Sequence, residues 1–516
     1  MSATQGRPKL TRASMAGQRG DEVASVETAI GVVPDRPRPP TLNADALLAQ
    51  DAAAMAEAVR SGVTTATALV QASLDRIAAT DKRINAFTDV VRERALRRAA
   101  QADASLASAT GDRTRALPLL GVPFAVKNLF DVAGLATLAG SKIERGAAPA
   151  VRDGLLVRRL EAAGAILVGA LNMDEYAYGF TTENSHVGPT RNPHDLKRIA
   201  GGSSGGSGAA VAAGQVPLTL GSDTNGSIRV PSSLCGVFGL KPTFGRLPRT
   251  GSYPFVSSLD HLGPFARSAR DLALCYDAMQ GPEGEGPHDP GCAQRAVEAV
   301  TPLLAQGADG LRIGVLTGYF REHVQPEAIL AVDRVAEALG ATRGVELPMV
   351  EAGRAAAFLI TNSEGAALHL HDLRLRPHDF EPLSRDRFLA GALLPAAWVT
   401  RAQRVRRAYA EAVARVFERF DILLAAATPC AATPIGAETF ELNGKTLPVR
   451  PNMGLLTQPI SCIGLPVCAV PVWGAHAHLP IGVQVIGAPW REDHVLRVAA
   501  SLEKAGVVHA PVAALR

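Results

Sequence analysis

Apolar residues recur at three- and four-residue steps between residues 43 and 109, a spacing that predicts amphipathic helices. Ser61-Gly62 interrupts the first helix, and Thr64 or Thr65 can cap the next. From Leu119 the pattern changes to short apolar runs bounded by Gly and Pro. The clearest runs are 122–126, 165–168, 216–220 and 237–240, with a helical pattern at 155–163. Strands alternating with helices indicate an α/β fold with a largely parallel sheet.

The second half of the chain continues this alternation after a segment rich in Gly, Pro and acidic residues, 277–290, which predicts a surface loop. Beyond it we expect strands at 312–316, 467–472 and 481–486, and helices at 326–339, 396–420 and 493–505. No segment repeats at a fixed period, which excludes a solenoid.

These patterns predict one large domain over residues 43–516, to which the stretch 280–420 adds a helical layer. Residues 1–42 mix Arg, Gly, Ser and Pro without an apolar core, so we expect a disordered N-terminal extension and no targeting segment.

Composition narrows the class of protein. The chain has 516 residues, of which 47% are hydrophobic, so it can bury a large core. Its net charge of +4 gives little reason to expect nucleic acid or an anionic membrane as a partner. The longest apolar stretch, 422–435, contains Pro429 and Pro434 and is too short to span a bilayer.

Cysteine and histidine usage points to the cytoplasm and away from metals. Six cysteines without a CxxC pair predict buried free thiols in a reducing cytoplasm. Twelve histidines occur without HExxH or Cys/His ligand spacing, so we expect no metal and no cofactor. We expect His186, His194 and His261, which lie near the motifs described next, to be ordinary histidines and not general bases.

The densest glycine stretch is 200–208, AGGSSGGSG, and it is followed by GSDTNGSIRVP at 221–231. Glycines at this density serve tight turns or close approach of the backbone. A phosphate cradle is one interpretation, but GxxxxGK[ST] and GxGxxG are missing. The other is a nucleophile site. Residues 201–205 match the short GxSxG pattern, but the polar segment 192–198 predicts no strand before it.

The stretch 201–231 resembles the signature of the amidase signature family, a GGSSGG loop followed by GSDxGGSIRxP. Segments 121–134, 171–177 and 480–487 are also similar to that family. The resemblance runs from about residue 45 to 505. It implies an amide hydrolase with the amidase signature fold, a large, mixed and mostly parallel sheet covered by helices on both faces.

The resemblance implies roles for individual residues. Ser227 matches the nucleophile, Ser203 the serine on a cis peptide bond, and Lys127 the general base. The backbone N–H groups that match the oxyanion hole are those of Thr224, Asn225, Gly226 and Ser227. Asn128 stands where many members have Asp, and Asn225 where many have Gly, which puts a side chain beside the reacting carbonyl.

These residue types fit the chemistry. A serine hydroxyl needs a base, and a lysine serves only when it is neutral, a form that burial favours. Ser203 would relay the proton between Lys127 and Ser227, and Ser–Lys arrangements are known variants of the catalytic triad. Supporting roles are expected for Ser204, Ser222, Asp223 and Arg229, the last two as a structural pair in preference to a substrate contact. Met173 and Tyr176 could line the pocket or belong to the core.

Shorter segments, 128–134, 174–184, 222–228 and 258–265, resemble one branch of the family, which releases ammonia from 1-carboxybiuret, a small anionic urea-like amide. That branch implies a small helical accessory subunit, and we also expect a homo-oligomer. A buried substrate carboxylate needs a cationic partner. Arg246, Arg249 and the arginines after residue 400 are the candidates.

Three other functions remain open. One is the glutaminase component of an aspartyl/glutamyl-tRNA amidotransferase, its A subunit, which is the only alternative that involves tRNA. The second is a general aliphatic or aryl amidase. The third is a non-catalytic protein that binds phosphate in the Gly/Ser loop, and the intact set of Lys127, Ser203 and Ser227 argues against it.

Overall fold

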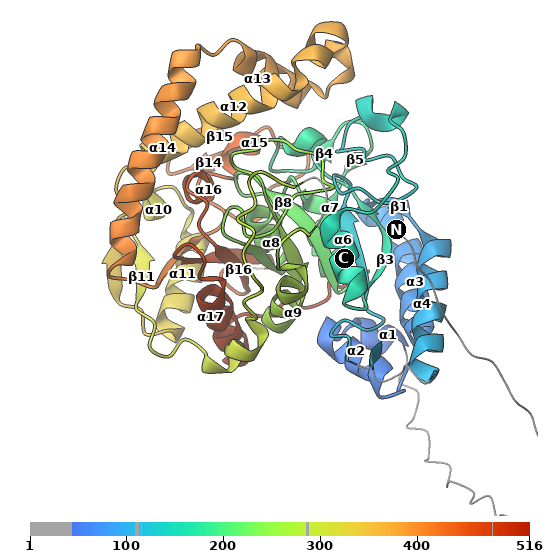
Figure 1. Cartoon of the computed structure of the whole chain (residues 1–516). Helices are drawn as coiled ribbons and strands as arrows, with labels where there is room; N and C mark the ends of the chain where they lie inside the picture. Colours follow the sequence, from blue (N-terminus) through green and yellow to red (C-terminus); the bar gives the residue numbers. More distant parts are fainter. Residues whose placement is uncertain (1–43, 109–112, 115, 285–287, 477, 516) are drawn as a thin grey trace, which may run out of the picture. The chain divides into compact units, whose positions relative to one another are not determined.

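The computed structural model describes residues 44–108, 113–114, 116–284, 288–476 and 478–515. These residues all belong to one compact unit (Figure 1). The expected N-terminal extension, 1–42, lies outside the described residues. In the part that is described, no helix is both long enough and apolar enough to cross a membrane.

The first described segment is helical, as its periodicity predicts. It contains α1 (Ala44–Leu48), α2 (Ala52–Arg60), α3 (Ala66–Ile84) and α4 (Arg92–Ala107). Asp51 and Thr65 cap α2 and α3, because their side chains accept hydrogen bonds from the first-turn N–H groups. A short strand, β1 (Phe87–Val90), lies between α3 and α4 and was not predicted. Its four residues are too few to interrupt the helical period.

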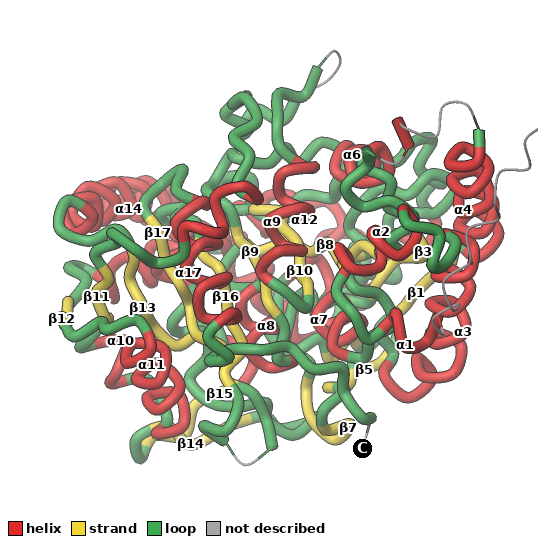
Figure 2. Tube along the Cα trace, turned by 90° about the horizontal axis from the view of Figure 1, so that it is seen from below, coloured by secondary structure: helices red, strands yellow, loops and turns green. Residues whose placement is uncertain are grey.

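Eleven strands form one sheet in the order β1-β3-β2-β8-β10-β9-β16-β17-β13-β11-β12. Figure 2 shows β1 and β12 at its opposite ends. The remaining strands are β2 (Pro123–Lys127), β3 (Ile166–Leu171), β8 (Leu218–Asp223), β9 (Phe238–Lys241), β10 (His261–Ala266), β11 (Ile313–Leu316), β12 (Arg343–Val345), β13 (Ile422–Ala426), β16 (Val467–Val472) and β17 (Ile481–Gly487). The prediction of a large mixed sheet is confirmed.

The prediction that this sheet is mostly parallel is wrong. Six of its ten neighbouring strand pairs are antiparallel, and they include every pair from β8 through β13. Strand β10 pairs with β8 on one side and β9 on the other, although a helix, α8 (Arg229–Cys235), connects β8 to β9. Strands β16 and β17 are joined by a short loop, which permits only antiparallel pairing. An apolar run predicts a buried strand but carries no information on its direction.

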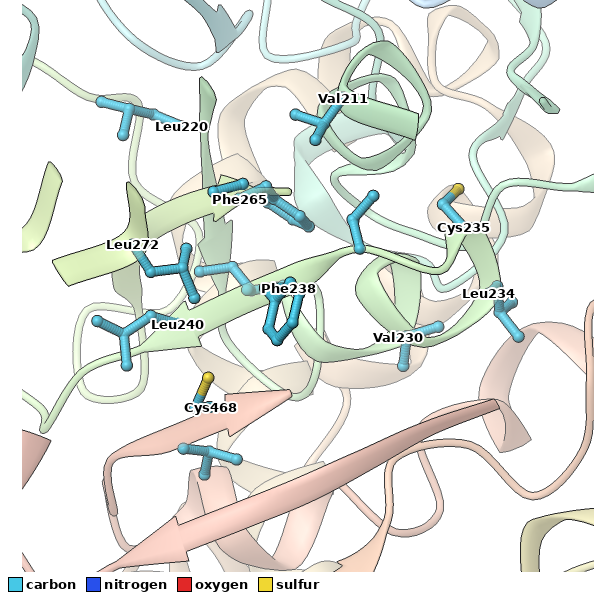
Figure 3. Close-up of a cluster of buried hydrophobic side chains, with 14 of the residues drawn as sticks. Val211, Leu220, Val230, Leu234, Cys235, Phe238, Leu240, Phe265, Leu272 and Cys468 are labelled. Carbon is cyan, nitrogen blue, oxygen red and sulfur yellow. The ribbon is translucent and has the colours of Figure 1, made fainter. Parts of the chain in front are cut away.

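Helices cover both faces of the sheet, as expected. They include α6 (Leu155–Ala162), α7 (Gly205–Ala212), α8 (Arg229–Cys235), α9 (Ala269–Met279) and α17 (Glu492–Lys504). Helix α7 packs on α8, and α9 packs on α17, while both pairs contact the central strands. Figure 3 shows the resulting core, with Val211 of α7, Leu234 of α8, Phe238 of β9, Phe265 of β10 and Leu272 of α9.

The stretch 280–420, expected as a helical layer, also extends the sheet through β11 and β12. Its helices are α10 (Tyr319–Glu322), α11 (Pro326–Ala338), α12 (Val350–Leu375), α13 (Pro382–Ala392) and α14 (Ala396–Phe417). Helix α12 packs on α13, on α14 and on α16 (Gln458–Cys462) (Figure 1). These contacts carry residues of the layer to the loops around the predicted site.

Smaller elements complete the described chain. They are β4 (Glu183–Asn184), β5 (Gly188–Pro189), β6 (Arg191–Asn192), β7 (Asp195–Ile199), β14 (Thr439–Leu442), β15 (Lys445–Pro448), α15 (Val449–Asn452) and the 3-10 turns η1 (Ile143–Gly146), η2 (Glu175–Ala177), η3 (Thr301–Gln306) and η4 (Pro377–Asp379). Strand β7 corrects the prediction that no strand precedes the glycine-rich loop. It pairs with β6 and, through an isolated bridge between Arg198 and Pro434, with a later segment, and it stays outside the main sheet.

Candidate active site

Lys127 is the last residue of β2, a strand that is buried along its whole length. Its Nζ lies 2.7 Å from Ser203 Oγ, 3.0 Å from Ser204 Oγ and 2.9 Å from Ser222 Oγ. The two neighbouring serines come from the loop before α7, and Ser222 comes from the adjacent strand β8. Three of the residues singled out from the sequence therefore surround the predicted base.

Lys127 is fully buried. Within the described residues, no carboxylate lies close enough to pair with its amine. Burial lowers the pKa of Lys127 to about 7, and this effect outweighs the carboxylates of Asp174, Asp260 and Asp223, which raise it. A large fraction of the amine is therefore neutral at neutral pH.

Ser203 sits in a tightly held loop. The peptide bond between Gly202 and Ser203 is cis. The carbonyl of Ser203 accepts a hydrogen bond from the N–H of Asp174 at 3.2 Å, and the Asp174 carboxylate accepts one from the N–H of Thr182 at 3.1 Å. Thr182 in turn accepts a hydrogen bond from the N–H of Gly205 through its hydroxyl, at 3.1 Å. These contacts fix the loop against the segment that follows β3.

Ser227 lies in the turn between β8 and α8 and is buried. The hydroxyl of Thr224 donates to Asp260 at 2.6 Å, and the hydroxyl of Thr457 donates to the backbone carbonyl of Asn225 at 2.7 Å. The backbone N–H groups of Asn225, Gly226 and Ser227 donate to no acceptor in the described part of the chain. They are free to bind an oxyanion, although the oxyanion hole itself stays a prediction.

Asp223 and Arg229 form a buried pair beneath this turn. Arg229 Nε and Nη2 donate to the two carboxylate oxygens of Asp223, each at 3.0 Å. Its Nη1 donates to Gln484 Oε1 at 2.8 Å and to the carbonyl of Thr457 at 3.1 Å. Burial would raise the pKa of Asp223, but Arg229 holds it well below its ordinary value. The guanidinium is occupied by protein atoms, so the pair is structural.

A small cavity opens beside Ser227, with a volume of about 10 Å³, which is room for about one water molecule. It is lined by aromatic and polar side chains, among them Tyr178, Phe180, Phe255, Phe358, Asn225, Thr361, Arg387 and Gln458. Phe358 is the most exposed lining side chain, at 38%, and also lines a neighbouring cavity of about 600 Å³. A larger ligand reaches Ser227 only if lining side chains move.

The sequence profile of the family described as Amidase matches residues 68–496. The chain belongs to the amidase signature family. It is therefore a hydrolase of amide C–N bonds, and its fold is the amidase signature fold.

Three relatives of this amidase are informative. The chain is 59% identical over 453 residues to AtzE of Pseudomonas sp. (strain ADP), described as a 1-carboxybiuret hydrolase subunit, covering 87% of this chain and 97% of that one. It is 38% identical over 469 residues to the A subunit of the glutamyl-tRNA(Gln) amidotransferase of Roseiflexus sp. (strain RS-1), covering 86% and 93%. A solved structure, described as a vestigial protein complex that reveals the origins of an s-triazine catabolic enzyme, aligns with a TM-score of 0.87. It is 58% identical and covers 89% of this amidase and all of that chain.

Arg246 and Arg249, named as candidates for binding a substrate carboxylate, do not line the cavity beside Ser227. Arg246 donates to the hydroxyl of Tyr276 at 2.8 Å, and Arg249 pairs with Asp289 at 2.7 Å. Arg249 lines an adjoining cavity of about 350 Å³, which is also lined by Ser222 and shares Ala177 and Phe255 with the cavity beside Ser227. Both guanidinium groups are bound by protein atoms, but only Arg249 lies in a cavity that borders the site.

Arg387 is the cation that the sequence analysis missed. It lies on α13, its guanidinium carbon is 3.7 Å from the centre of the Tyr178 ring, and it lines the cavity with Ser227. No described carboxylate forms an ion pair with it. No motif marks Arg387, because α13 belongs to the layer 280–420 and only tertiary packing brings it to the site.

The remaining predictions fall outside the site. His261 is buried and its Nδ1 lies 3.0 Å from the carbonyl of Asp223. Burial lowers the pKa of His194 to about 4, and His186 contacts Glu175 at 2.8 Å. None of the three histidines contacts Lys127, as expected.

Met173 and Tyr176 are core residues of the amidase. The ring of Tyr176 packs 3.9 Å from that of His369, centre to centre, and neither Met173 nor Tyr176 lines the cavity beside Ser227. All six cysteines are free thiols, and all except Cys292 are buried. The described residues contain no cluster of three His, Cys, Asp or Glu side chains that could hold a metal.

Proposed function

We propose that this amidase cleaves its substrate through Lys127 as general base, Ser203 as proton relay and Ser227 as nucleophile. The observation that carries the proposal is the 2.7 Å contact between Lys127 Nζ and Ser203 Oγ in a fully buried setting. A base with a pKa near the working pH accepts and returns protons most effectively. The value of about 7 for Lys127 meets that requirement.

The three hydroxyl contacts of Lys127 Nζ can be satisfied by a neutral amine, which has two N–H donors and one lone pair. Ser204 donates its hydroxyl proton to the carbonyl of Ser222 at 3.1 Å, so it accepts from Lys127. Ser222 Oγ takes the second N–H. The lone pair is then left for the hydroxyl proton of Ser203, which has no other partner among the described residues.

The proposed reaction has two stages. Ser227 Oγ forms a bond to the amide carbon, while its proton passes through Ser203 to Lys127. The backbone N–H groups of Thr224, Asn225, Gly226 and Ser227 bind the oxyanion. The C–N bond then breaks, and the proton returns through Ser203 to the nitrogen, which leaves as ammonia. Water attacks the acyl-enzyme by the reverse route, giving a carboxylic acid and free Ser227.

We further propose that the substrate is 1-carboxybiuret or a similar small urea-like amide. The 59% identity to a 1-carboxybiuret hydrolase subunit supports this assignment. So does Arg387, because a guanidinium that lines a small cavity and has no carboxylate partner among the described residues suits a ligand carboxylate. The first test compares wild type, Ser227→Ala and Ser203→Ala for ammonia release from 1-carboxybiuret, biuret, glutamine and simple amides. Ser61→Ala, on the surface, is the control.

Ser227→Ala is expected to lose both turnover and labelling by a fluorophosphonate, since it lacks the nucleophile. Ser203→Ala is expected to lose turnover because the relay is broken. Ammonia release by Ser227→Ala at the wild-type rate would refute the proposed nucleophile. Glutaminase activity that exceeds hydrolysis of 1-carboxybiuret would favour the alternative, the glutaminase component of a tRNA amidotransferase, which the 38% identical relative supports.

The second test examines Arg387. Arg387→Met should lower kcat/KM for 1-carboxybiuret by about 10- to 150-fold, because a hydrogen bond to a charged group contributes about 1.5–3 kcal/mol. Hydrolysis of neutral biuret should change little. Arg385→Met is the matched control, since Arg385 lies on the same helix and pairs with Asp386 at 2.9 Å. Equal losses for both substrates would contradict a carboxylate contact.

We propose that this chain forms a homo-oligomer in the cytoplasm and binds a small helical accessory subunit. The aligned structure described as a protein complex supports the binding of a partner. The six free cysteines support a reducing compartment. Co-expression with a candidate partner, followed by size-exclusion chromatography with light scattering, measures the assembly. A monomer that gains neither mass nor activity on co-expression would count against it.

A further inference from the structure

Asn225 is held in place at one end of its side chain only. It is 8% exposed and lines the cavity beside Ser227. Its Nδ2 donates to Thr361 Oγ1 of α12 at 2.8 Å, and its backbone carbonyl accepts from Thr457 at 2.7 Å. Its Oδ1 has no hydrogen-bond partner among the described residues. A buried amide oxygen that stays unpaired is unfavourable, and this one belongs to the wall that a ligand would touch.

We infer that Asn225 is a specificity-determining residue whose Oδ1 accepts a hydrogen bond from an N–H group that flanks the reacting carbonyl of the substrate. The inference rests on the proposed function and narrows its substrate class. The favoured substrates are acylureas and biurets, in which the scissile carbonyl has a nitrogen on both sides. Ordinary carboxamides have carbon at the flanking position and cannot donate there.

We assign the flanking N–H, and not the leaving nitrogen, as the donor to Asn225 Oδ1, because the leaving nitrogen must face the other side of the cavity. Protons reach the leaving nitrogen from Ser203, which contacts Lys127. Asn225 contacts neither residue, and its partners Thr361 and Thr457 belong to the α12 and α16 side of the site.

The test compares biuret with malonamide, which has CH₂ where biuret has the central N–H. Both are neutral, so Arg387 does not distinguish them. The kcat/KM ratio of biuret to malonamide is measured by ammonia release for wild type, Asn225→Gly and Thr361→Val. Where turnover is too slow, the ratio of inhibition constants against 1-carboxybiuret replaces it. Asn443→Gly, in the exposed turn between β14 and β15, is the matched control.

Asn225→Gly should lower the biuret-to-malonamide ratio by about 10- to 100-fold, the range expected for loss of one buried hydrogen bond. Thr361→Val, which frees the side chain of Asn225, should lower the ratio less, and Asn443→Gly should leave it unchanged. Thr361→Val keeps the test decisive if Asn225→Gly does not fold. A ratio that stays constant while both rates fall would place Asn225 on the leaving nitrogen and overturn the inference. If wild type neither releases ammonia from any of these substrates nor reacts with the fluorophosphonate, the proposed function itself is refuted.

Discussion

Replacing Arg229 with methionine tests whether the buried pair with Asp223 holds the catalytic turn. Methionine keeps much of the side-chain length but removes every donor. The change leaves the Asp223 carboxylate buried and unpaired, and it also leaves Gln484 Oε1 and the carbonyl of Thr457 without their partner. Breaking a buried ion pair from one side costs about 3–5 kcal/mol. A typical domain has only about 5–15 kcal/mol of stability.

The pH dependence gives this prediction a sign. The folded pKa of Asp223 lies below its ordinary value of 3.8, so in wild type the pair contributes stability above that value and loses it as pH falls through the folded pKa. In Arg229→Met, burial without the guanidinium raises the pKa of Asp223. The free energy of unfolding of the variant should therefore increase as pH falls from about 7 to 5. Its difference from the free energy of unfolding of wild type should become smaller.

The assay is urea unfolding followed by far-UV circular dichroism at both pH values. The double variant Asp223→Asn with Arg229→Met removes the stranded charge and should recover part of the loss. The reasoning is refuted if Arg229→Met lowers the free energy of unfolding by less than about 1 kcal/mol, or if the double variant recovers none of the loss. Either result would mean that the buried, unpaired charge costs little.

Two further predictions concern the turn and the base. Gly226→Ala should lower kcat by about 100-fold or more while far-UV circular dichroism stays unchanged, because a Cβ there would lie 2.1 Å from Thr457 Oγ1 and displace the oxyanion donors. Gly62→Ala is the control, because a Cβ at Gly62 meets no atom within 4 Å. A wild-type kcat in Gly226→Ala would contradict the oxyanion role. Ser204→Ala should lower kcat/KM about tenfold, because Lys127 loses a hydrogen-bond acceptor at 3.0 Å. Ser207→Ala removes only a hydrogen bond to the carbonyl of Leu220 and should leave kcat/KM unchanged. Equal effects of the two substitutions would contradict the supporting role of Ser204.

Elements with a strong local pattern could be predicted from the sequence. The strands and helices from β2 to α17 that were expected start and end within three residues of their predicted positions. The spacing of their apolar residues is a property of the local sequence, and it predicts which side of each element is buried. The direction of pairing depends on connections between distant strands, so the antiparallel centre around β10 could not be predicted from those runs.

The site shows the same division. Lys127, Ser203, Ser204 and Ser222 could be predicted because they belong to ordered motifs, and the structure brings them together. Arg387 could not be predicted, since its position depends on how α13 packs beside the cavity. The proposed role of Asn225 had a signal in the sequence, because an amide stands where the resembled family pattern has glycine. Its partner Thr361, on α12, had none.

The pH dependence of kcat/KM tests the central claim most directly, because it reports the ionisation of the free enzyme. Burial lowers the pKa of Lys127 to about 7, and only the neutral amine can accept the proton of Ser203. The value of kcat/KM should therefore rise with pH, with a midpoint near 7, and reach a plateau well below the ordinary lysine pKa of 10.5. A midpoint near 10.5, or the same rising limb in Lys127→Ala, would contradict a neutral Lys127 as the base.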